Sequence, residues 1–161
     1  MPVAAEEQVI QLVEAELAKV TTANGYQTDV GEDRVHRWAP GLGTESPGPK
    51  IYVEIAGSKQ APKDHRLSNT EARMLVITLD LQLSALTDAD VRLSNLLADV
   101  YQTLTDDVQL GGTVLDLEVG DVFRALTGGE QTSVHARALM EVFVFFRHVW
   151  ADPFTVSPPS P

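Results

Sequence analysis

The sequence contains no cysteine, and its 12 lysine and arginine residues are outnumbered by 23 aspartate and glutamate residues. The absence of cysteine excludes disulfides, thiolate chemistry and cysteine-ligated metals together. A net charge of −11 repels phosphate-rich surfaces. Sequence-specific binding of nucleic acid and attachment to an anionic membrane are therefore disfavoured.

Long apolar runs are also missing, and no stretch approaches the ~18 residues of a membrane-spanning helix. The first 12 residues include Glu6 and Glu7 but no basic residue, which is not typical of a signal peptide. We therefore expect a soluble chain that is located inside the cell that makes it. With 161 residues and a hydrophobic share of 43%, the chain is the size of one domain with a real core.

No arrangement of residues points to catalysis or to a cofactor. The four histidines do not occur at metal-binding spacings; they are His36, His65, His135 and His148. The Gly41-Leu-Gly43 stretch lies among prolines, and no helix opens after it as a phosphate-binding loop requires. The sequence therefore predicts no enzyme, no catalytic residue, no metal and no nucleotide or organic cofactor.

Two amphipathic helices are predicted from apolar residues at helical spacing. The first covers Val3–Ala23 and ends at Asn24-Gly25, a typical C-terminal stop. The second begins at an N-cap, Thr87, with Asp90 three residues later, and ends near Asp106.

Strands are predicted where apolar residues alternate with polar ones: Tyr26–Val30, Arg34–Trp38, Ile51–Ile55, Glu71–Ser84, Val114–Val119 and Thr132–Trp150. The segment Gly57–Asn69 is interpreted as an exposed loop or hairpin end, and Asp121–Gln131 as irregular chain with at most one helical turn. The pattern predicts an α+β fold, with two helices packed on one face of a mixed, largely antiparallel sheet of five to six strands. Residues 1–150 form this single domain, and residues 151–161 form a proline-rich C-terminal extension.

Three groups of residues suggest contacts with other proteins. Basic side chains cluster in one predicted loop, which could bind an acidic partner or simply be solvated: Lys59, Lys63, His65 and Arg66. Asp106 and Asp107 oppose the dipole at the end of the second helix, which suggests an acidic surface there. The extension carries Trp150, Phe154 and Val156, which predicts that it docks on its own domain or on a neighbour.

The whole-chain pattern resembles the tail terminator (tail completion) proteins of long-tailed bacteriophages. The resemblance is carried by the leading acidic helix, the Gly25–Gly31 segment and the long strand before the Leu96–Val100 helix. The Gly111-Gly112 turn and a closing strand that ends at Trp150 and Pro153 complete it.

The resemblance implies a structural protein of the virion, at the junction of neck and tail, that is assembled in the host cytoplasm. A hexameric ring of copies would cap the tail tube protein and bind a head-side connector or neck protein, while DNA passes through without specific binding. Four acids are then expected to face the lumen and repel the passing phosphates: Asp88, Asp90, Asp106 and Asp107.

Two alternatives remain open. The protein could be an adjacent neck or connector protein, such as a stopper or completion protein, which the sequence does not separate from a terminator. It could also be a small non-phage protein-binding domain that uses a half-open sheet as its groove. The oligomeric state discriminates between a ring and a groove-binding monomer.

Overall fold

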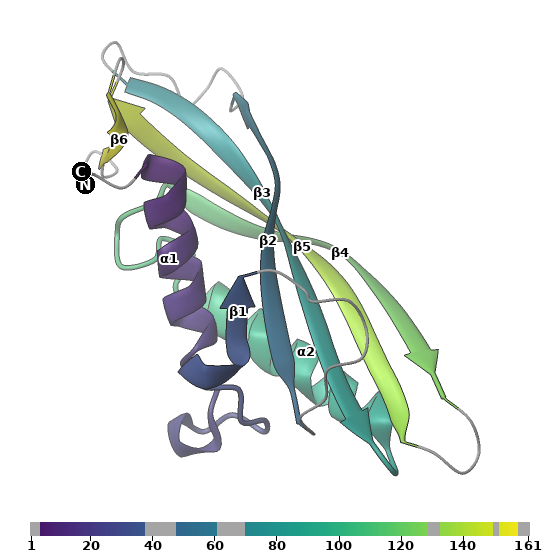
Figure 1. The fold of residues 1–161 in the computed structure, drawn as a ribbon. Coiled ribbons are helices and arrows are strands. Elements are labelled where there is room, and N and C mark those ends of the chain that lie inside the picture. Colours follow the sequence, from purple (N-terminus) through teal and green to yellow (C-terminus); the bar gives the residue numbers. More distant parts are fainter. Residues whose placement is uncertain (1–3, 38–47, 61–69, 129–132, 150–151, 158–161) are drawn as a thin grey trace.

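The computed structural model describes residues 4–37, 48–60, 70–128, 133–149 and 152–157. In chain order the helices and strands are α1 (Ala5–Leu17), β1 (Val35–Arg37), β2 (Lys50–Gln60), β3 (Thr70–Ala85), α2 (Ala89–Asp106), β4 (Asp116–Thr127), β5 (Val134–Val149) and β6 (Asp152–Ser157). Two short 3₁₀ turns, η1 (Thr22–Asn24) and η2 (Glu32–Arg34), lie between α1 and β1. The predicted α+β fold is confirmed (Figure 1).

The strands form one twisted sheet in the order β1-β2-β3-β5-β4, and β6 pairs with β5 beyond the start of β4. Only the β1–β2 pair is parallel, so the sheet is mixed and largely antiparallel. At its centre β3 and β5, each of 16 residues, pair along their whole length without a register shift. β2 and β4 lie on opposite sides of this central pair (Figure 1).

The main hydrophobic core lies between the helices and one face of the sheet. Alternate residues of β3 and β5 are fully buried there because side chains of a strand point to opposite faces in turn. Both helices add residues to the same cluster, so they cover the same face of the sheet. The core includes Leu75, Ile77, Leu79, Leu81, Ala138, Val142 and Phe146 from the central strands, with Val9, Val13, Leu93 and Leu96 from the helices.

The first helix is shorter than predicted, because it ends at Leu17 rather than at Ala23. The chain tightens there, with the N–H of Lys19 donating to the carbonyl of Glu16 at 3.0 Å. The carbonyl of Val20 then accepts hydrogen bonds from the N–H groups of Val30 and Gly31, at 2.8 and 3.2 Å. Those bonds fold the following segment back and prevent the helix from continuing.

The predicted strand at residues 26–30 is wrong, because a side chain from α2 supplies its hydrogen bonds. Asp99 is 3% exposed, and its Oδ2 accepts from the backbone N–H of Gln27 and of Thr28, at 3.0 and 2.8 Å. The hydroxyl of Thr28 donates to the same oxygen at 2.6 Å. These contacts hold the segment against the helix as a loop.

Two strands are longer than predicted, and one helix start differs. β2 runs on through Gly57–Gln60, the first part of the segment that was predicted as an exposed loop or hairpin end. β4 continues from Asp121 to Thr127, where irregular chain with at most one helical turn was predicted. α2 has Asp88 at its N-cap position in the left-handed region (φ 57°, ψ 30°), without a side-chain capping bond, so the predicted cap at Thr87 is wrong.

Candidate functional site

The second half of β4 is the most exposed stretch of regular structure in the described chain. Within the described ranges β4 pairs only with β5, and every residue from Asp121 to Thr127 is exposed. Three of them are large and apolar: Val122, Phe123 and Leu126 are 40%, 63% and 51% exposed. An apolar edge strand of this length presents unpaired backbone groups that can pair with another chain.

A β-bulge separates this stretch from the first half of β4. The register shifts between Val119 and Val122, and Gly120 lies within the shift. A Cβ atom at Gly120 would lie 2.6 Å from the ring of Phe143, so the ring and the backbone approach each other closely because glycine is present. Bulges bend a strand and increase its twist, so the outer part of β4 runs in a different direction from the first half.

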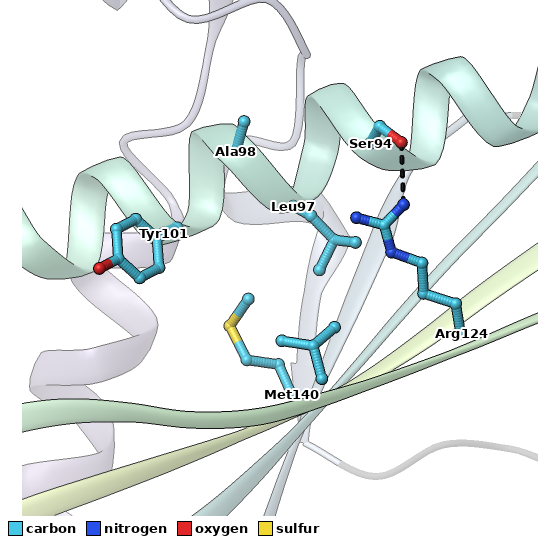
Figure 2. Close-up of a pocket in the computed structure, with 7 residues that line it drawn as sticks. Ser94, Leu97, Ala98, Tyr101, Arg124 and Met140 are labelled. Carbon is cyan, nitrogen blue, oxygen red and sulfur yellow. Dashed lines mark hydrogen bonds between the residues drawn. The ribbon is translucent and has the colours of Figure 1, made fainter.

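An open groove of about 610 Å³ lies between this stretch and α2. Ser94, Leu97 and Tyr101 line it from the helix side, and Met140 from β5 lies opposite them (Figure 2). Arg124 of β4 reaches across and donates from Nη1 to the hydroxyl of Ser94 at 3.0 Å. The lining is largely apolar with one cationic end, which suits an inserted side chain rather than proton transfer.

A second free edge lies on the other side of the sheet, along β2. The short strand β1 pairs only with Ile51–Val53, and no other described strand covers the same edge from Glu54 to Gln60. Ile55 is 43% exposed there, and Glu54 and Lys59 are exposed as well. The register with β3 shifts between Ile55 and Gly57, so this stretch also follows a bulge.

Of the four residues of the predicted basic loop, the structure describes one. Lys59 lies exposed near the end of β2, as a strand residue rather than a loop residue. Lys63, His65 and Arg66 lie outside the described residues. Their role in binding a partner stays a prediction.

The four acids predicted to face a lumen lie at the two ends of α2. Asp88 and Asp90 flank its start and Asp106 and Asp107 its end; 18 helical residues separate the ends by about 27 Å. Asp107 has a local structural role, because its carboxylate accepts from the N–H of Gln109 at 3.2 Å and of Gly111 at 2.6 Å. Asp106 is exposed and has no such role, so it is the more informative of the pair.

The described part of the C-terminal extension, Asp152–Ser157, docks on its own domain by adding β6 to the sheet. Val156 pairs with His148 of β5 and packs against the core. The carbonyl of Phe154 accepts a hydrogen bond from Nε2 of Gln8 in α1 at 2.6 Å, while its side chain is 45% exposed. Trp150 lies outside the described residues.

Two further features of the described part of the chain bear on other kinds of site. No group of three or more histidine, aspartate or glutamate side chains is placed so that it could hold a metal ion. No helix there is both long enough and apolar enough to cross a membrane.

The sequence did not indicate which strands would form the two free edges, although one signal was present. Val122, Phe123 and Leu126 form an apolar cluster just before the Gly128-Gly129 turn, and a predicted strand follows it. Apolar residues beside such a turn are typical of a hairpin, which is how β4 and β5 are connected.

Compared with known proteins, the sequence matches no protein-family model and no curated protein.

Proposed function

We propose that the protein is a structural tail terminator of a long-tailed bacteriophage, which caps the tail tube as a hexameric ring and joins it to the head connector. The observation that carries the proposal is the pair of free sheet edges, β4 on one side and Glu54–Gln60 of β2 on the other. The resemblance of the sequence to this family gives the proposal its biological setting.

A closed ring needs two different, complementary surfaces on each subunit, because its contacts run head to tail. The two edges are different segments on opposite sides of one sheet, which meets that requirement. Extension of a sheet by a strand from another chain is a common way for proteins to associate. A symmetric dimer through β4 alone would leave the β2 edge uncovered.

The charge of the chain suits a channel for DNA. Each subunit carries a net charge of −11, and Asp88, Asp90 and Asp106 are exposed around α2. A single exposed pair of like charges at 4 Å costs only about 1 kcal/mol in water. Repeated around a narrow channel, the acids would produce a field that keeps passing phosphates away from the wall.

The proposal is tested by the oligomeric state and by the effect on tube growth. We expect native mass spectrometry of the purified protein, alone or with short tail tubes, to show a closed ring of six copies. Addition of the protein to a polymerising tail tube protein should stop its elongation. A monomer at high concentration, both alone and with tubes present, would contradict the proposal.

The lumen assignment has its own test, with a matched control. We expect the triple variant Asp88→Asn, Asp90→Asn, Asp106→Asn to fold and form rings but to slow DNA passage in reconstituted particles. Asp107 is left unchanged because its carboxylate holds a turn. Glu32→Gln, in the exposed η2 turn, removes an acid away from α2 and should leave passage unchanged.

The α2–β4 groove favours a second candidate, a small protein-binding domain that takes up a side chain of its target. Such a domain would remain a monomer and would not stop tube growth. A neck protein, such as a stopper, would form a ring but bind the head-side connector without arresting the tube.

A further inference from the structure

We infer that β4 of one copy pairs antiparallel with the Glu54–Gln60 stretch of β2 in the next copy, with Phe123 beside Gly57. The inference rests on the proposed ring and specifies which edges close it. Each subunit is then a segment of one continuous sheet, and a second copy of the same chain occupies each free edge.

The strand directions within one subunit support this pairing. The path from β2 to β4 has three steps, β2–β3, β3–β5 and β5–β4, and each of them is antiparallel. An odd number of antiparallel steps makes β4 run opposite to β2. Two neighbouring copies whose sheets continue in the same sense therefore bring together edges that are already antiparallel.

The lengths of the two free stretches also agree. β1 covers β2 only at Ile51–Val53, so among the described strands none pairs with the same edge over the seven residues Glu54–Gln60 (60 − 54 + 1). The exposed part of β4, Asp121–Thr127, also has seven residues (127 − 121 + 1). With Phe123 beside Gly57, Leu126 pairs with Glu54 and Asp121 with Lys59, so an incoming β4 fills the edge of β2 from the end of β1 onward.

The pairing places neighbouring copies at an offset along the strands, as a closed sheet requires. Within one subunit Phe123 pairs with Leu139, Leu139 with Asp80, and Asp80 with Tyr52. Phe123 and Tyr52 therefore lie at the same height along the strands. Pairing Phe123 with Gly57 instead shifts the neighbour by about five residues, or roughly 17 Å at the usual rise of a strand. Strands of a closed sheet tilt relative to its axis and are staggered in this way.

The side chains fit on the face opposite the helices. Gly57 pairs with Val76, which alternates with the buried Leu75 and Ile77, so both residues belong to the open face. A Cβ atom at Gly57 would have nothing within 4 Å, which leaves space for the exposed ring of Phe123 from a neighbour. An aromatic ring over a strand glycine is a favourable cross-strand arrangement.

Charge favours a second copy over an unrelated chain. The pairing brings Lys59 of β2 near Asp121 of the incoming β4, and neither makes an ion pair with another described residue of its own chain. The same chain thus carries two edges that match in direction, length and charge.

The absence of cysteine makes cross-linking a test without background. Directly paired residues of antiparallel strands have Cα atoms about 4.5–5.5 Å apart, within the range that a disulfide can bridge. We would prepare Gly57→Cys and Phe123→Cys as separate variants and as a double variant, and check each for ring formation under reducing conditions by native mass spectrometry. Oxidation would follow, with analysis by non-reducing electrophoresis.

We expect each single variant to remain monomeric on the gel, an equal mixture of the two to give a covalent dimer, and the double variant to give a ladder up to the closed ring. Self-cross-linking of Phe123→Cys alone would overturn the inference, because it would show a symmetric β4–β4 contact. So would rings that persist while neither this pair nor a second pair, Lys59→Cys with Asp121→Cys, cross-links. Loss of rings in the unmodified protein would instead overturn the proposed function itself.

Discussion

The centre and the edges of the same sheet are built differently. β3 and β5 pair without interruption over 16 residues, and their alternate side chains are buried by both helices. β2 and β4 each contain a register shift, and beyond it β4 is exposed at every residue. The hydrophobic core contains no residue of the outer half of β4. That edge therefore presents large apolar side chains that the core of its own subunit does not bury.

The largest expected effect compares two phenylalanines. Phe146 on β5 is 0% exposed and Phe123 on β4 is 63% exposed. We expect Phe146→Ala to lower the free energy of unfolding by about 3–5 kcal/mol, because it removes a buried ring and leaves a cavity. Phe123→Ala should change it by less than about 0.5 kcal/mol. Urea denaturation of the dilute monomer measures both, and equal losses would remove the distinction between centre and edge.

Two arginines provide a smaller test of the same comparison. Arg137 of β5 donates from Nε and Nη2 to the carboxylate of Asp80, at 2.8 and 2.7 Å, and this bond raises the pKa of Arg137. Asp80 is 5% exposed, so Arg137→Ala would leave a buried carboxylate with Gln82 as its remaining bonded neighbour.

We expect Arg137→Ala to cost about 2 kcal/mol, at the lower end for a broken buried pair because the arginine itself is partly solvated. Arg124→Ala at the edge removes a hydrogen bond to Ser94 and should cost less than about 0.5 kcal/mol. A loss at Arg124 as large as that at Arg137 would mean that the α2–β4 groove helps to hold the subunit together.

Glycine substitutions sharpen the comparison further, since both edges contain one near a bulge. A methyl group at Gly120 would meet the ring of Phe143 at 2.6 Å, whereas one at Gly57 would meet nothing within 4 Å. We expect Gly120→Ala to cost about 1–2 kcal/mol through local overpacking, and Gly57→Ala to be neutral or slightly stabilising. Thermal unfolding of the two variants measures the difference, which vanishes if Phe143 rotates away freely.

The smallest effect concerns pH at two carboxylates outside the central strands, Asp29 between η1 and η2 and Asp152 at the start of β6. Hydrogen bonds from the N–H and hydroxyl of Thr22 lower the pKa of Asp29, and bonds from the hydroxyl of Thr155 and the N–H of Phe154 lower that of Asp152. A lowered pKa stabilises the fold above the ordinary value of 3.8, and this contribution is lost as the pH falls through the lower folded value.

We therefore expect the wild type to lose stability slightly more than the double variant Asp29→Asn, Asp152→Asn when thermal unfolding is compared between pH 6 and pH 2.5. The variant should be the less pH-sensitive protein over that interval. An identical pH dependence of the two proteins would contradict the assignment.

The sequence best predicted those elements whose buried residues recur at a regular spacing. Strict alternation from Leu75 to Leu83 predicted β3, and helical spacing from Leu93 to Leu104 predicted α2, because each element packs one face on the core. The loop at residues 26–30 was missed because Tyr26, Thr28 and Val30 alternate like a strand, while Asp99, distant in sequence, supplies its bonds.

The candidate site was harder to predict, because pairing at a sheet edge depends on non-local contacts. The outer half of β4 lacks alternation since neither of its faces is covered, so a pattern of burial does not mark it as a strand. The sequence correctly predicted that the four aspartates lie at the two ends of α2. The hydrogen bonds that give Asp107 a structural role depend on the turn after α2, and the sequence did not predict those bonds.

Hydrogen–deuterium exchange of the monomer and of the assembled ring tests most directly whether the edges, and not the centre, carry assembly. We expect amides of residues 121–127 and 54–60 to exchange rapidly in the monomer and to become protected on assembly, while those of β3 and β5 are protected in both states. Protection that appears instead on the outer surface of α2 or on the open face of the sheet, with both edges still exchanging rapidly, would contradict this expectation.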